Sequence, residues 1–160
     1  MIVSQLMTKT VWHCRIGDNL DEPAHLMWDH DVGCVPVTDD AGAVVGMITD
    51  RDICIATYTQ GLSPSKIAVA SAMSKILWTA SPDDDLGSVA RRMAMHQLRR
   101  MPVLDAFGRL VGIITLGDLA RCARHAGPIA PAQVSYTLAT ITAPRMPAIA
   151  AEPEPVRSSA

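Results

Sequence analysis

The chain repeats itself in tandem, and this repeat constrains its fold more than any other feature of the sequence. Met7 aligns with Met73, an offset of 66 residues, and the match continues without a gap to Ile53 and Leu119. Both copies close on glycine, two apolar residues, threonine, two variable residues and aspartate, written GMITDRD and GIITLGD. A duplication of this length predicts two similar structural units.

Each copy predicts the same order of elements, which makes the expected fold class α+β, a mixed α/β fold. A short extended segment near Val11 or Leu77 is followed by a helix, two strands and a second helix. In the second copy, Ser81 and Pro82 favour a helix start, and LGSVARRM then carries apolar residues at helical spacing. The strands RMPVL and LVGIIT flank a turn in which Gly108 can take a positive φ.

The first copy departs from this pattern at one position. Pro23 falls where the second copy has Val89, inside the expected helix. Because proline lacks an amide donor and clashes with the preceding turn, that helix is expected to start late, near residues 21–23, or to kink. His30 and His96 end the first helix of each copy, where pairing with free carbonyl groups and the helix dipole is expected rather than metal binding.

Glycine occupies the same strand position in both copies, at Gly46 and Gly112. A glycine inside a strand often marks a place where another backbone or a ligand comes close. Either neighbour is compatible with the pattern.

Composition excludes several classes of protein. The chain has 160 residues, a net charge of −2 and only 4% aromatic residues, which argues against a nucleic-acid binder. MIVSQLMTKTVW has no charged segment leading into a long apolar one, so no signal peptide is expected. No apolar run approaches the roughly 18 residues of a membrane span, and a cytoplasmic location is expected.

The cysteines and the other reactive residues give little sign of catalysis. The four cysteines, at positions 14, 34, 54 and 122, form no CxxC motif and are expected to be small buried hydrophobes. No nucleophile–base pair, phosphate-binding P-loop or metal-ligand cluster is recognisable, so we expect no enzyme, no metal and no required cofactor. The alternative is a redox- or metal-responsive stress protein that acts through its cysteines.

Residues 127–160 form an extension beyond the repeat. Val134, Leu138 and Ile141 have helical spacing, which predicts a short amphipathic helix over residues 131–142. The proline- and alanine-rich end that follows has no periodicity and is expected to be disordered.

Two such copies, each closing on G-h-h-T-x-x-D (h, an apolar residue), resemble a pair of CBS (cystathionine β-synthase) domains over residues 2–125. The resemblance implies one repeat over 1–62 and another over 63–126, packed with pseudo-twofold symmetry. It implies a regulatory module that binds AMP, ADP, ATP, NAD or S-adenosylmethionine between the repeats, with AMP or ATP foremost. A homodimer and an unidentified protein partner are also implied.

By this resemblance, Thr49 with Asp52 and Thr115 with Asp118 mark two ligand sites. A carboxylate can accept two hydrogen bonds at once, which suits the neighbouring hydroxyls of a ribose. Threonine at the strand end offers a hydroxyl and backbone amides to a phosphate near a helix N-terminus. The same residues are ordinary helix caps, and capping is compatible with ligand binding.

Further ligand contacts are implied around these motifs. Arg99 and Arg100 precede a strand of the second copy, and Arg51 lies inside the first motif. Each of these arginines is expected either to meet a phosphate or to remain a solvated surface residue. The apolar walls around adenine come, by family geometry, from Val32, Leu98, Met7 and Met73.

Overall fold

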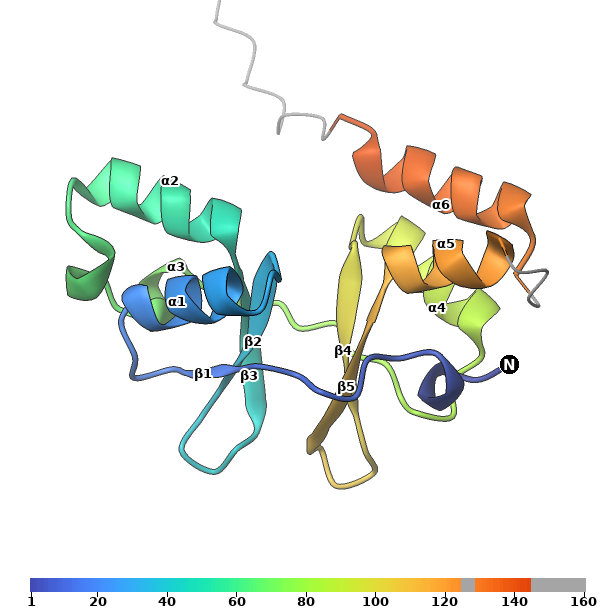
Figure 1. Ribbon diagram of the computed structural model, residues 1–160, viewed down its shortest axis with the longest axis horizontal. Coiled ribbons are helices and arrows are strands. Elements are labelled where there is room, and N and C mark those ends of the chain that lie inside the picture. The colour runs from blue at the N-terminus through green and yellow to red at the C-terminus, as the bar shows by residue number, and fades with distance from the viewer. Residues whose placement is uncertain (125–128, 145–160) are drawn as a thin grey trace, which may run out of the picture.

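The computed structural model describes residues 1–124 and 129–144 and shows two similar halves side by side (Figure 1). The first half contains β1 (Cys14–Arg15), α1 (Asp21–Asp29), β2 (Cys34–Thr38), β3 (Val44–Thr49), α2 (Asp50–Gln60), η2 (Pro64–Lys66) and α3 (Val69–Ala72). The second half contains η1 (Val3–Gln5), α4 (Leu86–Met95), β4 (Arg100–Leu104), β5 (Leu110–Thr115), α5 (Leu116–Arg124) and α6 (Pro131–Thr142). The expected mixed α/β fold, with helix, strand, strand and helix in each copy, is confirmed.

In each half the two main strands form an antiparallel pair, and the two pairs have the same register. Cys34 faces Thr49 in β2–β3, and Arg100 faces Thr115 in β4–β5. The register shift near the end of β2 recurs at the equivalent place in β4. The turn after β4 places Gly108 at φ 76°, which is the conformation predicted for it. The sequence repeat is therefore a structural repeat at the level of individual residue pairs.

A third, parallel segment lies beside each strand pair. In the first half, β1 pairs with β2. In the second half, a single parallel bridge between Ala80 and Val103 takes the same place. The predicted extended segments near Val11 and Leu77 therefore pair slightly further along the chain, at Cys14 and Ala80.

Helix α1 starts late, as the proline predicts. Its first residue is Asp21, and Pro23 lies in the first turn, where the amide of the helix has no partner to lose. The predicted helix start in the second copy, at Ser81–Pro82, is wrong, because α4 begins at Leu86.

The reason lies in three consecutive aspartates before α4. The Asp84 carboxylate accepts a hydrogen bond from the Ser81 amide at 2.9 Å and pairs with Arg92, which closes residues 81–84 into a turn. Asp85 then caps α4, because its carboxylate accepts from the Ser88 amide at 3.1 Å. The capping role passes from the serine to an aspartate further on.

The segment that precedes each copy packs against the other half. At the N-terminal end, Thr8 exchanges two backbone hydrogen bonds of 2.9 Å with Ile113 of β5, and Val3 is fully buried in the second core. Between the copies, Ser74 exchanges backbone bonds of 2.9 and 3.1 Å with Met47 of β3. Figure 1 shows the N-terminal segment running past both halves. The two halves are therefore interlocked.

These crossings explain the repeated strand glycine. A Cβ atom at Gly46 would lie closest to the carbonyl oxygen of Ser74, at 2.6 Å. One at Gly112 would lie closest to the Met7 side chain and 3.1 Å from the carbonyl oxygen of Thr8. In both halves the close neighbour is thus the crossing segment of the chain, which is one of the two alternatives that the pattern left open.

Helix α6 occupies the predicted range and packs against α4 and α5 (Figure 1). Ile141 and Thr137 are buried, and the Gln97 side-chain amide donates to the carbonyl oxygen of Thr140 at 3.2 Å. Leu138, by contrast, is 48% exposed. The expected disorder of the chain end falls on residues 145–160, which lie outside the described residues.

Each half has its own hydrophobic core. The first core includes Leu20 and Ile48, and the second includes Leu86, Met93 and Ile114, all of them almost completely buried. In the described ranges 1–124 and 129–144, no helix combines the length and the apolar character that crossing a membrane requires.

Candidate functional site

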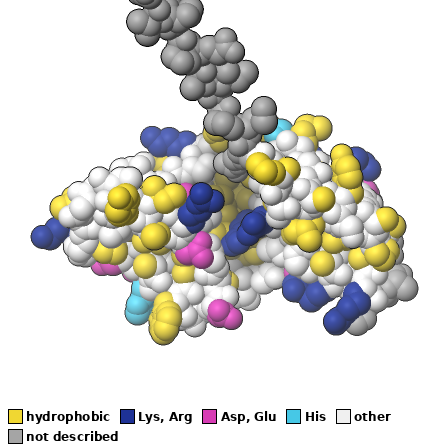
Figure 2. Space-filling view, turned by 90° about the horizontal axis from the view of Figure 1, so that it is seen from above, with side chains coloured by type: hydrophobic (Ala, Val, Ile, Leu, Met, Phe, Trp, Pro, Cys, Tyr) yellow, Lys and Arg dark blue, Asp and Glu magenta, His cyan; other side chains and the backbone are white. Residues whose placement is uncertain are grey.

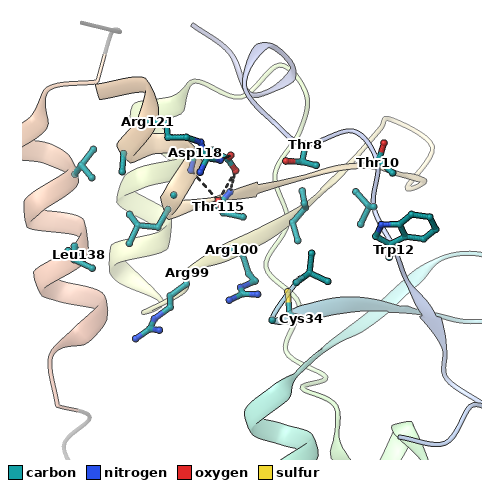
Figure 3. Close-up of a pocket in the computed structure, with 18 residues that line it drawn as sticks. Thr8, Thr10, Trp12, Cys34, Arg99, Arg100, Thr115, Asp118, Arg121 and Leu138 are labelled. Carbon is teal, nitrogen blue, oxygen red and sulfur yellow. Dashed lines mark hydrogen bonds and ion pairs between the residues drawn. The ribbon is translucent and has the colours of Figure 1, made fainter. Parts of the chain in front are cut away.

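A cavity of about 730 Å³ lies between the two halves (Figure 3). Seen from above, the hollow has hydrophobic side chains in its depth and Lys or Arg side chains on both sides (Figure 2). The first half contributes Val32, Gly33 and Cys34, and the N-terminal segment contributes Thr8, Thr10, Val11 and Trp12. The second half contributes Arg99, Arg100, Ile113, Thr115, Leu116, Gly117, Asp118, Ala120 and Arg121, and α6 adds Val134 and Leu138.

The junction of β5 and α5 carries the Thr–Asp motif at the cavity wall. Asp118 Oδ2 accepts hydrogen bonds from the Thr115 amide at 2.8 Å and from Thr115 Oγ1 at 2.7 Å. In return, the Asp118 amide donates to Thr115 Oγ1 at 3.1 Å. The motif is therefore a reciprocal helix cap, and it holds the carboxylate of an aspartate that is only 4% exposed at the edge of the cavity.

The second oxygen of this carboxylate is also engaged. Asp118 Oδ1 forms an ion pair with Nη2 of Arg121, one turn further along α5. The Arg121 side chain is 66% exposed and lines the cavity. The sequence alone does not single out Arg121, although a spacing of three residues on a helix brings two side chains together.

The motif in the first half has the same internal geometry. Asp52 Oδ2 accepts from the Thr49 amide at 2.9 Å and from Thr49 Oγ1 at 2.7 Å. Thr49, Asp52 and the exposed Arg51 lie outside the wall of the cavity. The offset of 66 places Ile55 where the second half has Arg121, so the guanidinium partner is specific to the second half.

Arg99 and Arg100 reach the cavity from the start of β4. Figure 3 places Arg100 between Cys34 and the Thr115–Asp118 motif. Burial raises the pKa of the Cys34 thiol, and the nearby Arg100 guanidinium opposes part of that rise. With Arg121, three guanidinium groups and one carboxylate line this space, so its charge favours an anionic ligand.

Of the four apolar residues expected around adenine, Val32 lines the cavity and the other three do not. Met7 and Leu98 pack against the second core, and Met73 is buried in the first. The physical reason is the crossing of the segments: Met7 lies over Gly112 and Met73 over Gly46, so both side chains fill the space that the glycines leave.

A tryptophan stacks on a histidine in each of the two copies. Trp12 stacks on His30 with ring centroids 3.7 Å apart, and Trp78 stacks on His96 at 3.5 Å. Both histidines directly follow a helix, as expected, but their rings face tryptophans. The signal for this contact was present in the sequence, since both residue types recur in register. Trp12 also lines the cavity.

The thiols are mostly inaccessible. Cys14, Cys34 and Cys122 are buried and Cys54 is exposed. Burial raises the pKa of the Cys14 thiol to about 12. Within the part of the chain that the structure describes, no three His, Cys, Asp or Glu side chains come together as a metal site would require.

The fold and the cavity define a class of protein module, two interlocked α/β repeats with a space for a small ligand between them. A family model described as CBS domain matches the chain twice, over residues 3–57 and 69–125. The chain belongs to the CBS domain family and contains a tandem pair. The two matches start 66 residues apart, which is the offset of the repeat.

Relatives and solved structures agree with this assignment. The CBS domain-containing protein YhcV of Bacillus subtilis is 40% identical over 74% of this chain and 82% of YhcV. The CBS domain pair of protein MJ0100, in complex with 5-methylthioadenosine and S-adenosyl-L-methionine, has a TM-score of 0.71 and 26% identity over 79% of this chain and 98% of that chain. CBSX2 in complex with AMP has a TM-score of 0.66 and 26% identity over 78% of this chain and 97% of that chain.

Proposed function

We propose that this CBS pair is a regulatory module that binds an adenosine-containing nucleotide, AMP or ATP foremost, in the cavity beside Asp118. The ligand state then passes to a protein partner or to a second copy of the chain, and the module acts in the cytoplasm without a catalytic step. The observation that carries this proposal is the cavity of about 730 Å³ with the Thr115–Asp118 motif in its wall. That volume is in the range of small-molecule sites.

The chemistry of the wall fits the parts of a nucleotide. A carboxylate suits the two ribose hydroxyls, because it can accept a hydrogen bond from each. The start of α5 and the arginines at the entry of β4 suit a phosphate. Val11, Val32 and Ile113 give the cavity an apolar side for a base.

Two structural neighbours add support, because both hold adenosine-containing ligands. MJ0100 holds 5-methylthioadenosine and S-adenosyl-L-methionine, and CBSX2 holds AMP. In this chain the excess of guanidinium groups over carboxylates favours the phosphorylated ligands over the sulfonium compound.

Helix α6 could pass the ligand state to the rest of the module, because it contacts both the cavity and the neighbouring helices. Val134 and Leu138 line the cavity, while the buried face of the same helix packs on α4 and α5. A ligand shifts such packing only if it binds the two states with different affinity. For a homodimer, the exposed Trp28, Ile55 and Tyr58 offer apolar surface on the helices of the first half.

Titration calorimetry with AMP, ADP, ATP, NAD and S-adenosylmethionine tests the proposal. In Asp118→Ala, two hydrogen bonds to a charged group are lost, each worth about 1.5–3 kcal/mol, so affinity is expected to fall about 100-fold or more. Asp40→Ala removes one exposed carboxylate in the turn between β2 and β3 and serves as the matched control. Failure of all five ligands to bind would refute the proposal.

Asp52→Ala tests the first-half motif separately. A lower binding stoichiometry in this variant would assign a second ligand to Thr49 and Asp52, with Arg51 as a candidate phosphate contact. Unchanged affinity in both aspartate variants would refute the ribose assignment even if a nucleotide binds.

The alternative of a cysteine-based redox or metal sensor has less support. Three of the four thiols are buried, and the raised pKa of Cys14 disfavours its thiolate.

A further inference from the structure

Both oxygens of the Asp118 carboxylate have partners within the chain. Thr115 holds one oxygen through its amide and hydroxyl, and Arg121 holds the other. Oδ2 already accepts two hydrogen bonds from Thr115, so two ribose hydroxyls would have to bind at Oδ1 and displace the guanidinium there. The two groups differ sharply in mobility, because the Asp118 side chain is 5% exposed and the Arg121 side chain 66% exposed. The arginine is the partner that can move.

The two copies differ at two motif positions, and this difference makes room for Arg121 in the second copy. Where the first copy has Arg51 and Ile55, the second has Gly117 and Arg121. A Cβ atom at Gly117 would lie 3.4 Å from Nη1 of Arg121, so the guanidinium lies over a position without a side chain. Within residues 1–124 and 129–144, a cation contacts the second oxygen of the motif aspartate only in the second copy.

We propose that Arg121 is a specificity-determining residue that selects phosphorylated adenosine over neutral adenosine, an inference that rests on the proposed function. With no anion in the cavity, Arg121 stays on Asp118 and competes with ribose for its oxygen. A phosphate in the cavity gives the guanidinium a new partner, and the carboxylate becomes available to both ribose hydroxyls.

The charge balance explains the selection. Neutral adenosine that displaces Arg121 from Asp118 replaces a charged hydrogen-bond donor by a neutral one and leaves the guanidinium without an anion. A phosphorylated ligand restores that ion pair at the phosphate, and charge-assisted hydrogen bonds are the stronger kind. The phosphate also meets Arg99 and Arg100, which line the same cavity.

The test compares AMP and adenosine on the full chain by titration calorimetry. In the wild type, AMP is expected to bind at least about tenfold more tightly than adenosine. In Arg121→Gln, AMP is expected to weaken while adenosine strengthens, so that the ratio of the two affinities falls by about tenfold or more. This opposite movement is the signature, because a general loss of packing would weaken both ligands together.

Matched variants separate charge, length and fold. Arg121→Lys keeps the positive charge and is expected to keep most of the preference for AMP. Arg109→Gln removes a guanidinium that pairs with Asp105 in a turn outside the cavity, and it is expected to leave both affinities unchanged. Arg121→Leu is a second neutral variant if the glutamine variant is poorly folded.

The outcomes distinguish a failure of the Arg121 role from a failure of the proposed nucleotide binding. Equal changes for AMP and adenosine, or no change, in the neutral variants would overturn the role of Arg121 and leave the proposed function standing. Absence of binding by both ligands to the wild type would remove the proposed function and the role of Arg121 with it.

Discussion

Replacing Gly46 by alanine is expected to destabilise the protein, because the new methyl group would meet the segment that crosses between the halves. The added Cβ would lie 2.6 Å from the Ser74 carbonyl oxygen, whereas a carbon and a carbonyl oxygen normally stay about 3.3 Å or more apart. The Met73 sulfur, at 3.0 Å, belongs to a flexible side chain and can move. The Ser74 carbonyl is fixed, since it accepts a backbone hydrogen bond from Met47 at 3.1 Å.

The loss in the free energy of unfolding has two sources, overpacking around the new methyl group and strain on the Ser74–Met47 hydrogen bonds. Overpacking of a core position costs about 1–3 kcal/mol. A shift of Ser74 also weakens its two backbone hydrogen bonds to Met47, worth about 1 kcal/mol each. We expect a loss of about 3 kcal/mol in the free energy of unfolding, which lowers Tm by about 6–12 °C for a chain of this size.

Thermal unfolding followed by circular dichroism measures this loss. Gly17→Ala is the matched control, because a Cβ atom at Gly17 would meet nothing within 4 Å. That control is expected to be neutral or slightly stabilising. A Tm of Gly46→Ala equal to that of the control would refute the explanation of the repeated glycine.

Two further predictions concern titratable groups. At pH 8 a thiol reagent is expected to modify the exposed Cys54, while Cys14, with a pKa raised to about 12, reacts only on unfolding; peptide mass mapping distinguishes the two. Hydrogen bonds from the amide and the guanidinium of Arg109, at 2.9 and 2.8 Å, lower the pKa of Asp105 in the folded protein. This stabilisation is present at neutral pH and is lost as the pH falls through the folded-state pKa, so the Tm values of wild type and Asp105→Asn are expected to converge in acid.

The order of elements was predictable because it is a local property repeated twice. Apolar spacing, turn glycines and the position of Pro23 act over a few residues, and each reads the same in both copies. The start of α4 was harder, because Ser81 and Asp85 are both good caps. Asp85 is the residue that caps α4, because Asp84 pairs with Arg92 and holds Ser81 in a turn before the helix.

The crossing segments could not be predicted from local patterns. The pairing of Thr8 with Ile113 joins residues far apart in the chain, and nothing near either residue specifies the partner. For this reason Met7 and Met73 were expected at a ligand and lie in the cores instead.

The candidate site was predictable where it repeats and obscure where it does not. Thr115 and Asp118 stand out because the first copy has the same motif. Arg121 has no counterpart in the first copy, and its partner is defined only when α5 is built. The contribution of α6 to the cavity wall also depends on packing, because Leu138 faces the cavity rather than the core.

The interlocked segments have a consequence for synthesis and for evolution. Thr8 is synthesised 105 residues before its partner Ile113 in β5, and Val3 is synthesised 81 residues before its partner Asp84. This segment can therefore pair only after most of the second copy has been made. A fragment containing one repeat alone would lack the segment that pairs with its own strand, because that segment precedes the other copy. Neither copy is therefore a complete structural unit by itself, although the ligand chemistry of each copy can diverge.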